Sequence, residues 1–230
     1  MKPESLFWIE LVEDLRHRKS LMFKFVLPVI LTIPFALPQF TSHIRYAGLS
    51  LIALFLGVLG SSAGLARMKE RGILERLSIL PQRFGKLMRD FLFANVAMDL
   101  LQMAAPIVIL AFAFGLGGDS IALASVALVL SVLLANTIGV LVATAAGGSG
   151  EVHLYSAICV LFVAGLSGTF SSGSGGAMQA VSTVMPFDLL THGLSQASVG
   201  DAFVQLLASS AFTLALTAVA ILGSERFLRR

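Results

Sequence analysis

Residues 121–146 read IALASVALVLSVLLANTIGVLVATAA and contain no charged side chain. A helix needs about 20 apolar residues to cross the ~30 Å hydrocarbon core of a bilayer, so this stretch is long enough to span one. The whole chain is similar: 57% of its 230 residues are hydrophobic and 13% are charged, and its mean hydropathy is +0.89. A soluble domain carries about 25% charged residues, and a disordered chain needs low hydrophobicity. The composition therefore excludes both classes and predicts an all-α integral membrane protein.

Five further stretches are long and apolar enough to be spans, although the prolines at 28, 34 and 38 predict kinks in the first of them. Together they predict a single six-span domain over residues 21–230. The expected spans are 21–39, 46–66, 91–114, 121–146, 154–170 and 202–223.

Residues 1–20 are too rich in Glu and Arg to cross a membrane. Their apolar residues, such as Trp8, Leu11 and Leu15, recur at helical spacing, while acidic side chains occupy other faces. This pattern predicts an amphipathic helix that lies in the membrane interface. A helix that packs on a partner subunit is the alternative.

The 16 Lys and Arg residues are confined to a few segments of the chain. Five lie in 1–24, seven in 67–89 and three in 226–230, and none lies between the last two segments. Because positively charged loops stay in the cytoplasm, six spans place both termini and the 67–89 loop there, and leave only Arg45 outside. This alternation also argues against a nucleic-acid partner, which the formal charge of +3 alone would allow.

Motifs for catalysis and metal binding are missing from the sequence. The nearest approach to an ATP-binding P-loop is at Gly85 and Lys86, but Leu80 and Leu87 stand where the motif requires a glycine and a hydroxyl. The four histidines are scattered singly, without the spacing of metal ligands. We therefore expect no catalytic residue, no metal site and no cofactor in this chain.

Residues 67–83 form the longest internal loop on the expected cytoplasmic side. Ile73, Leu74 and Leu77 form an apolar stripe at helical spacing, and charged residues lie off it. A short amphipathic helix of this kind is typical of a docking surface. A helix that merely lies on the membrane surface explains the same pattern.

The sequence ERGILERLSILP of residues 70–81 resembles the segment after the second span of ABC-2 type permeases, the membrane subunits of ATP-binding cassette exporters. In that family a Glu, a Gly and a Leu-Glu-Arg-Leu run end at a Pro, and this helix couples to the ATPase. The resemblance implies that residues within 67–83 couple to an ATPase. The matching positions are Glu70, Gly72, Leu74, Glu75 and Leu77.

A second stretch resembles the same family. LSGTF at residues 166–170 and MPF at residues 185–187 are similar to the Ser-Gly-x-Phe and the later Pro that bracket an outer re-entrant hairpin. The resemblance implies such a hairpin over residues 171–200, and its Gly- and Ser-rich start offers the necessary break in the helix. The alternative is an exposed linker. The hairpin residues carried over from the family are Gly168, Phe170 and Pro186.

The resemblance implies a permease subunit in the plasma membrane of a prokaryote, surrounded by membrane lipid. It would pair with a second copy or a paralogue, and two copies of a separate ATPase subunit would supply ATP and Mg²⁺. The apolar composition favours export of a hydrophobic or amphipathic substrate. A secondary transporter or channel without an ATPase is the alternative function.

Asp99 is the only acidic residue well inside an expected span. A carboxylate at the centre of a membrane helix costs roughly 2.5–3.5 kcal/mol on insertion scales, so it is expected to face protein or a cavity. Asn95 and Gln102 share its helix face. With Asn95, it is a candidate for the wall of a substrate pathway; an interhelical hydrogen bond near the cytoplasmic end is the alternative.

Overall fold

The computed structural model describes residues 18–37, 42–78, 84–114, 118–167, 177–190 and 199–227. Every regular element within these ranges is a helix, which confirms the all-α prediction. The helices are α2 (Arg18–Phe35), α3 (Ser42–Glu70), α4 (Ile73–Ser78), α5 (Phe84–Phe114), α6 (Gly118–Ala145), α7 (Ser149–Leu166), α8 (Ala177–Val184), α9 (Pro186–Asp188) and α11 (Val199–Phe227).

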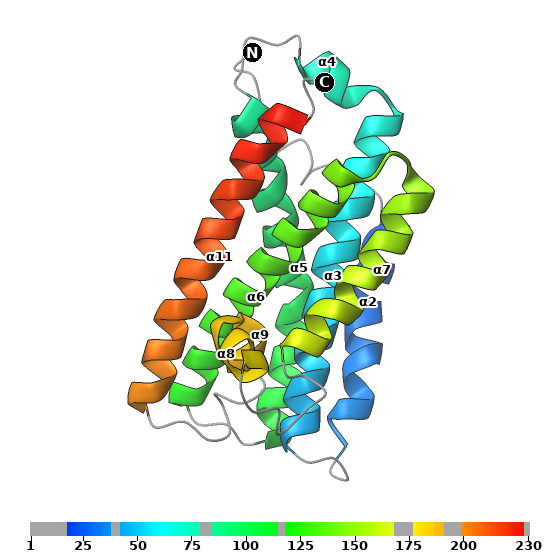
Figure 1. Ribbon diagram of the computed structural model, residues 1–230. Coiled ribbons are helices and arrows are strands. Elements are labelled where there is room, and N and C mark those ends of the chain that lie inside the picture. Colours follow the sequence, from blue (N-terminus) through cyan, green and yellow to red (C-terminus); the bar gives the residue numbers. More distant parts are fainter. Residues whose placement is uncertain are drawn as a thin grey trace, which may run out of the picture.

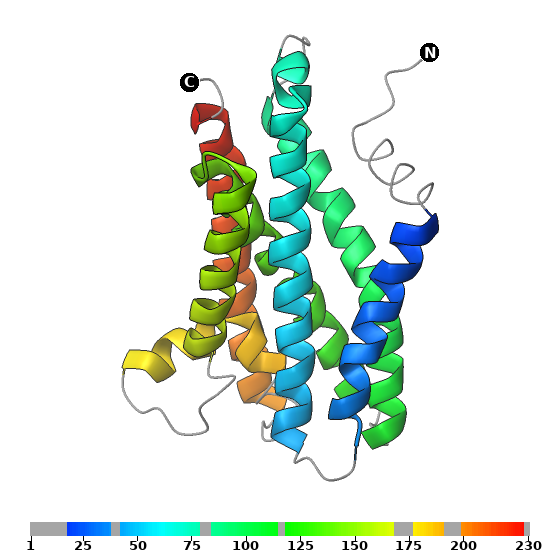
Figure 2. The same cartoon turned by 90° about the vertical axis from the view of Figure 1, so that its right-hand side faces the viewer.

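The long helices form one bundle (Figure 1). α3 and α6 pack most extensively against each other at its centre. α2 and α5 lie together on one side of α3, and α7 and α11 lie on the other side (Figure 2). The short α4 and the last turn of α11 lie at one end of the bundle, which we call the α4 end, while α8 and α9 lie near the opposite end (Figures 1 and 2).

Five of the described helices are long and apolar enough to cross a membrane, which indicates a multi-pass membrane protein. The remaining predicted span, 21–39, corresponds to α2, whose apolar part is only Lys24–Phe35. This part is shorter than the about 20 residues that a bilayer requires. Lys24 interrupts the apolar run at one end, and α2, which contains Pro28 and Pro34, ends before the predicted boundary. The candidate spans are Tyr46–Glu70, Phe84–Leu110, Ala122–Ala145, Ser149–Leu166 and Phe203–Gly223.

The non-spanning predictions are covered only partly by the described residues. Of the expected interfacial helix 1–20, residues 1–17 lie outside them, and the last three residues belong to α2. The segment 67–83 is divided between the end of α3, a turn and α4, and its last five residues lie outside the described ranges. The segment 171–200 contains α8 and α9, and its residues 171–176 and 191–198 lie outside the described ranges.

Small residues let α3 and α6 approach closely. A Cβ atom added to Gly139 of α6 would collide with Ser61 Oγ and would lie 2.6 Å from the carbonyl oxygen of Val58. A Cβ on Gly57 of α3 would lie 2.6 Å from the Cβ of Ala135. Ser61 Oγ also donates across the crossing to the carbonyl oxygen of Asn136, at 3.1 Å. Membrane helices associate through such close packing and hydrogen bonding, because lipid chains are as apolar as leucine.

Candidate functional site

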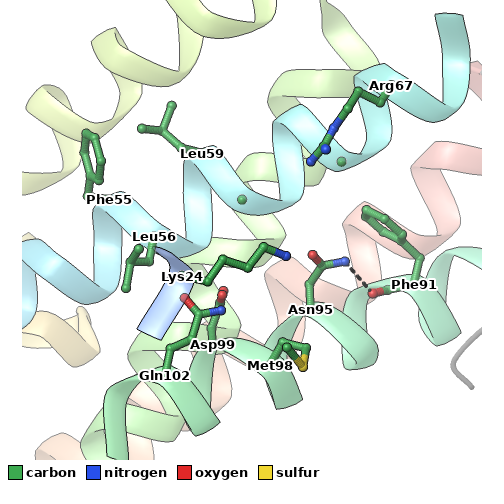
Figure 3. Close-up of a pocket in the computed structure, with 12 residues that line it drawn as sticks. Lys24, Phe55, Leu56, Leu59, Arg67, Phe91, Asn95, Met98, Asp99 and Gln102 are labelled. Atoms are coloured by element: carbon green, nitrogen blue, oxygen red, sulfur yellow. Dashed lines mark hydrogen bonds between the residues drawn. The ribbon is translucent and has the colours of Figure 1, made fainter. Parts of the chain in front are cut away.

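A cavity of about 150 Å³ lies between α2, α3 and α5, and we call it the α2–α3–α5 cavity (Figure 3). Both polar and apolar side chains line it. The polar side chains are Lys24, Arg67, Asn95, Asp99 and Gln102, and the apolar ones include Phe55, Leu56, Leu59, Phe91 and Met98. The structure thus brings both predicted pathway residues, Asp99 and Asn95, to one cavity.

Asp99 lies halfway along α5. This helix begins at Phe84 rather than at the expected residue 91, and Phe84 and Leu87 of its first turn are buried in the core. The side chain of Asp99 is only 7% exposed, so the carboxylate faces protein in the middle of a candidate span.

One hydrogen-bond partner of Asp99 comes from α6. Asn136 Nδ2 donates to Asp99 Oδ2 at 2.7 Å and to the carbonyl oxygen of Val132 at 2.9 Å. Asn136 Oδ1 is buried and has no hydrogen-bond partner among the described residues. The interhelical hydrogen bond that the sequence allowed is thus present, but its donor is a residue that the sequence did not single out.

The two polar neighbours of Asp99 on α5, Asn95 and Gln102, also line the cavity. Asn95 Nδ2 donates to the carbonyl oxygen of Phe91 at 3.0 Å, within its own helix (Figure 3). Gln102 is buried and lines the cavity beside Asp99. Lys24 reaches into the same cavity from α2 (Figure 3). The sequence placed Lys24 only among the cytoplasmic charges, because the packing of α2 against α5 was not foreseeable.

The α3–α4 connection contains the predicted coupling residues. α3 ends at Glu70, and Gly72 has a φ of 64°, a left-handed conformation that glycine adopts without steric cost. The amide of Gly72 donates to the carbonyl oxygen of Lys69 at 3.0 Å, and Arg76 donates back to Gly72 at 3.3 Å. Gly72 therefore permits the sharp turn into α4.

Ile73 and Leu74 of the apolar stripe of α4 turn toward the protein itself. Leu74 is 7% exposed and belongs to the same core cluster as Phe84 and Leu87. Glu70 is exposed, as are Arg71 and Arg76. Glu75 and Leu77 lie in α4, but their side chains fall outside what the structure describes. The exposed surface at this end is therefore charged, and Leu74 packs beneath it in the core.

Lys69 connects α3 to α6 and was not predicted. Its Nζ donates to the carbonyl oxygens of Ala143, at 3.1 Å, and Ala146, at 3.0 Å, where α6 ends. A cation at a helix C-terminus satisfies the last carbonyl groups and interacts favourably with the helix dipole. A second hollow, of about 170 Å³, lies beside it between Lys69, Glu70 and the Gly147–Gly148 turn.

The predicted hairpin residues have only one described member. Pro186 is buried and begins α9, while Gly168 and Phe170 lie outside the described residues. Ser50 Oγ of α3 donates to the carbonyl oxygen of Phe187, at 3.3 Å. Gln205 of α11 donates to Asp188 Oδ2 at 2.7 Å. These bonds join α9 to two long helices.

No protein-family model matches this chain, and none of the curated proteins is detectably similar to it in sequence. Within the described ranges, no group of three or more His, Cys, Asp and Glu side chains could hold a metal ion.

Proposed function

We propose that this chain is the permease subunit of an ATP-binding cassette exporter of the ABC-2 type. Two such subunits would form a pathway for a hydrophobic or amphipathic substrate, and a separate ATPase would drive it. α2 would complete the set of six spans, with both termini and α4 in the cytoplasm. The proposal rests on the resemblance of residues 70–81 and on the multi-pass helical fold.

The observation that carries the proposal is the set of contacts that connects α4 to the central helices α3 and α6. The Gly72 turn joins α4 directly to α3, Leu74 anchors it in the core, and Lys69 ties the same end of α3 to the end of α6. A force applied to the exposed charged residues at and before α4 would therefore reach both central helices. Such a two-helix connection suits a segment that transmits ATPase motion to a pathway.

The first experiment tests ATPase docking by charge reversal. The tagged chain is purified from its native membranes, and ATP hydrolysis in the purified material is measured. We expect the combination of Glu70→Lys and Arg76→Glu to abolish the associated hydrolysis, because close charge pairs at interfaces are worth several kcal/mol. Lys86→Glu is the matched control, since Lys86 is also an exposed cation in the first turn of α5. Absence of hydrolysis with the unmodified chain, or its persistence in the double variant, would contradict the proposal.

The second experiment tests transmission through Lys69. Lys69→Met removes the donor to Ala143 and Ala146 but keeps the length of the side chain. We expect it to retain the ATPase and lose ATP-driven transport, whereas Lys69→Arg keeps both. Equal transport by the two variants would show that the bond to α6 is only structural.

A secondary transporter without an ATPase is the second candidate, and the position of Asp99 favours it. Buried carboxylates within membrane helices form the proton relays of many pumps and transporters. In reconstituted vesicles with an internal pH-sensitive dye, such a carrier would move protons without ATP, and Asp99→Asn would stop this flux. ATP-dependent transport that survives Asp99→Asn would exclude this candidate.

A further inference from the structure

The size of the α2–α3–α5 cavity limits what it can hold. Sites for drug-sized ligands are typically ~300–1,000 Å³ in volume, whereas this cavity has about 150 Å³. It is therefore too small for a whole amphiphile. It has room for the headgroup end of an amphiphile but not for the full length of the molecule.

The charges around the cavity favour an anion. Lys24 and Arg67 line it with positive charge, and Asp99 is the single acidic residue among the lining side chains. The lining side chains therefore carry two positive charges against one negative charge. Arg67 is exposed, and its Nε donates to the carbonyl oxygen of Ala63 at 3.2 Å. A guanidinium has five N–H donors, so four remain for a ligand.

The order of groups along α3 matches the polarity of a lipid. Arg67 lies toward the α4 end, and Phe55 and Leu56 lie deeper in the span. The axial distance from Arg67 to Phe55 is about 18 Å, close to half of the ~30 Å hydrocarbon core. Between these positions Gly60 leaves part of the cavity surface without a side chain, which we call the cavity floor. A Cβ there would meet only Asp99 Oδ1, at 3.9 Å. A headgroup at Arg67 would thus leave its acyl chain beside the exposed ring of Phe55.

We propose that the α2–α3–α5 cavity binds the anionic headgroup of a membrane lipid from the leaflet at the α4 end. Arg67 contacts the phosphate, Lys24 adds positive charge to the same cavity, and the surface at Gly60, which carries no side chain, admits the glycerol region. Basic pockets between membrane helices bind anionic headgroups in this way. The site goes beyond the proposed function, because it needs neither an ATPase nor a transport cycle.

A tryptophan in the cavity wall would report the lipid directly. The chain has one tryptophan, Trp8, and Trp8→Phe with Phe55→Trp moves the reporter to the cavity. The protein is reconstituted in phosphatidylcholine vesicles that contain brominated phosphatidylglycerol or brominated phosphatidylcholine at equal mole fraction. We expect stronger quenching by the anionic lipid. We also expect Arg67→Gln to lower the preference about fivefold, the equivalent of about 1 kcal/mol for one basic residue.

Matched variants separate the site from general membrane attraction. Gly60→Leu should abolish the preference by filling the floor, whereas Gly165→Leu on α7, where a Cβ would meet no atom within 4 Å, should keep it. A reporter made by Phe162→Trp on the exposed side of α7 should be quenched equally by both lipids.

Three outcomes would overturn the proposal. Equal quenching of the cavity reporter by both lipids would show that the cavity has no headgroup preference. Displacement of brominated phosphatidylglycerol by inorganic phosphate would identify a site for a soluble anion. Protection of the reporter from both lipids would show that a second copy of the chain covers the cavity.

Discussion

The spans of α3 and α11 have the same mean hydropathy, but the fold uses them in opposite ways. In α3, 61% of the span is buried inside the protein, whereas in α11 only 22% is buried. α11 exposes large side chains such as Val204, Leu214 and Leu222, and α3 carries Gly57 and Ser61 at its contact with α6. Hydropathy therefore identifies a membrane helix without telling whether it faces lipid or protein. Small and polar residues make that distinction.

The central α3–α6 crossing should be the most sensitive part of the molecule. Gly139→Leu forces a side chain into Ser61 and the backbone of α3, and we expect a loss of about 3 kcal/mol, the upper end for overpacking. Gly165→Leu on α7 meets no neighbouring atom and should be neutral or slightly stabilising. Unfolding by SDS titration measures both. Equal stability of the two variants would refute the close α3–α6 contact.

Truncation of apolar side chains should have the second-largest effect on stability, and it should distinguish a buried helix face from an exposed one. Leu134 of α6 is 1% exposed, and Leu161 of α7 is 68% exposed. Leu134→Ala leaves a cavity and should cost about 2 kcal/mol, the lower end of the range for buried leucines. Leu161→Ala replaces one lipid contact by another and should change the free energy of unfolding little. If Leu161→Ala is the more damaging change, that face of α7 contacts protein rather than lipid.

The bond between Asp99 and Asn136 should contribute less than the packing of the crossing. A double-mutant cycle with Asp99→Ala and Asn136→Ala isolates the coupling between the two side chains. Interhelical hydrogen bonds in membranes are worth up to about 1.7 kcal/mol, and this buried charged acceptor places the pair at that upper limit. The free energies of unfolding of all four proteins in the cycle are measured by SDS titration under identical conditions. Additive effects of the two changes would show that the bond contributes nothing.

The weakest expected effects are at the hydroxyl pairs that attach the outer helices to the centre. Ser62 and Ser156 join α3 to α7 with an Oγ–Oγ distance of 2.8 Å. Thr137 and Thr217 join α6 to α11 with an Oγ1–Oγ1 distance of 3.0 Å. Ser156→Ala and Thr217→Val should each cost about 0.6 kcal/mol, the average for such bonds in a membrane. A loss as large as that of Gly139→Leu would mean that the attachment of α7 and α11 matters as much as the core.

The Asp99 region shows where prediction from the sequence stopped. The sequence singled out Asp99 because a lone acid in an apolar span is costly, and it correctly predicted burial. Helical spacing placed Asn95 and Gln102 on the same face as Asp99, whereas Asn136 of α6 donates a hydrogen bond to it. No spacing rule connects residues on different helices, so neither Asn136 nor the approach of Lys24 from α2 was predictable.

The sequence by itself determined the membrane class, the all-α fold and the approximate positions of five candidate membrane-spanning helices. Each follows from local properties, because apolar length and helix breakers act over a short stretch of chain. Only the tertiary structure decided that α3 and α6 are central, that Lys69 ties their ends together and that Leu74 faces inward. In lipid all apolar faces are nearly equivalent, so the arrangement depends on how small and polar residues of different helices fit together.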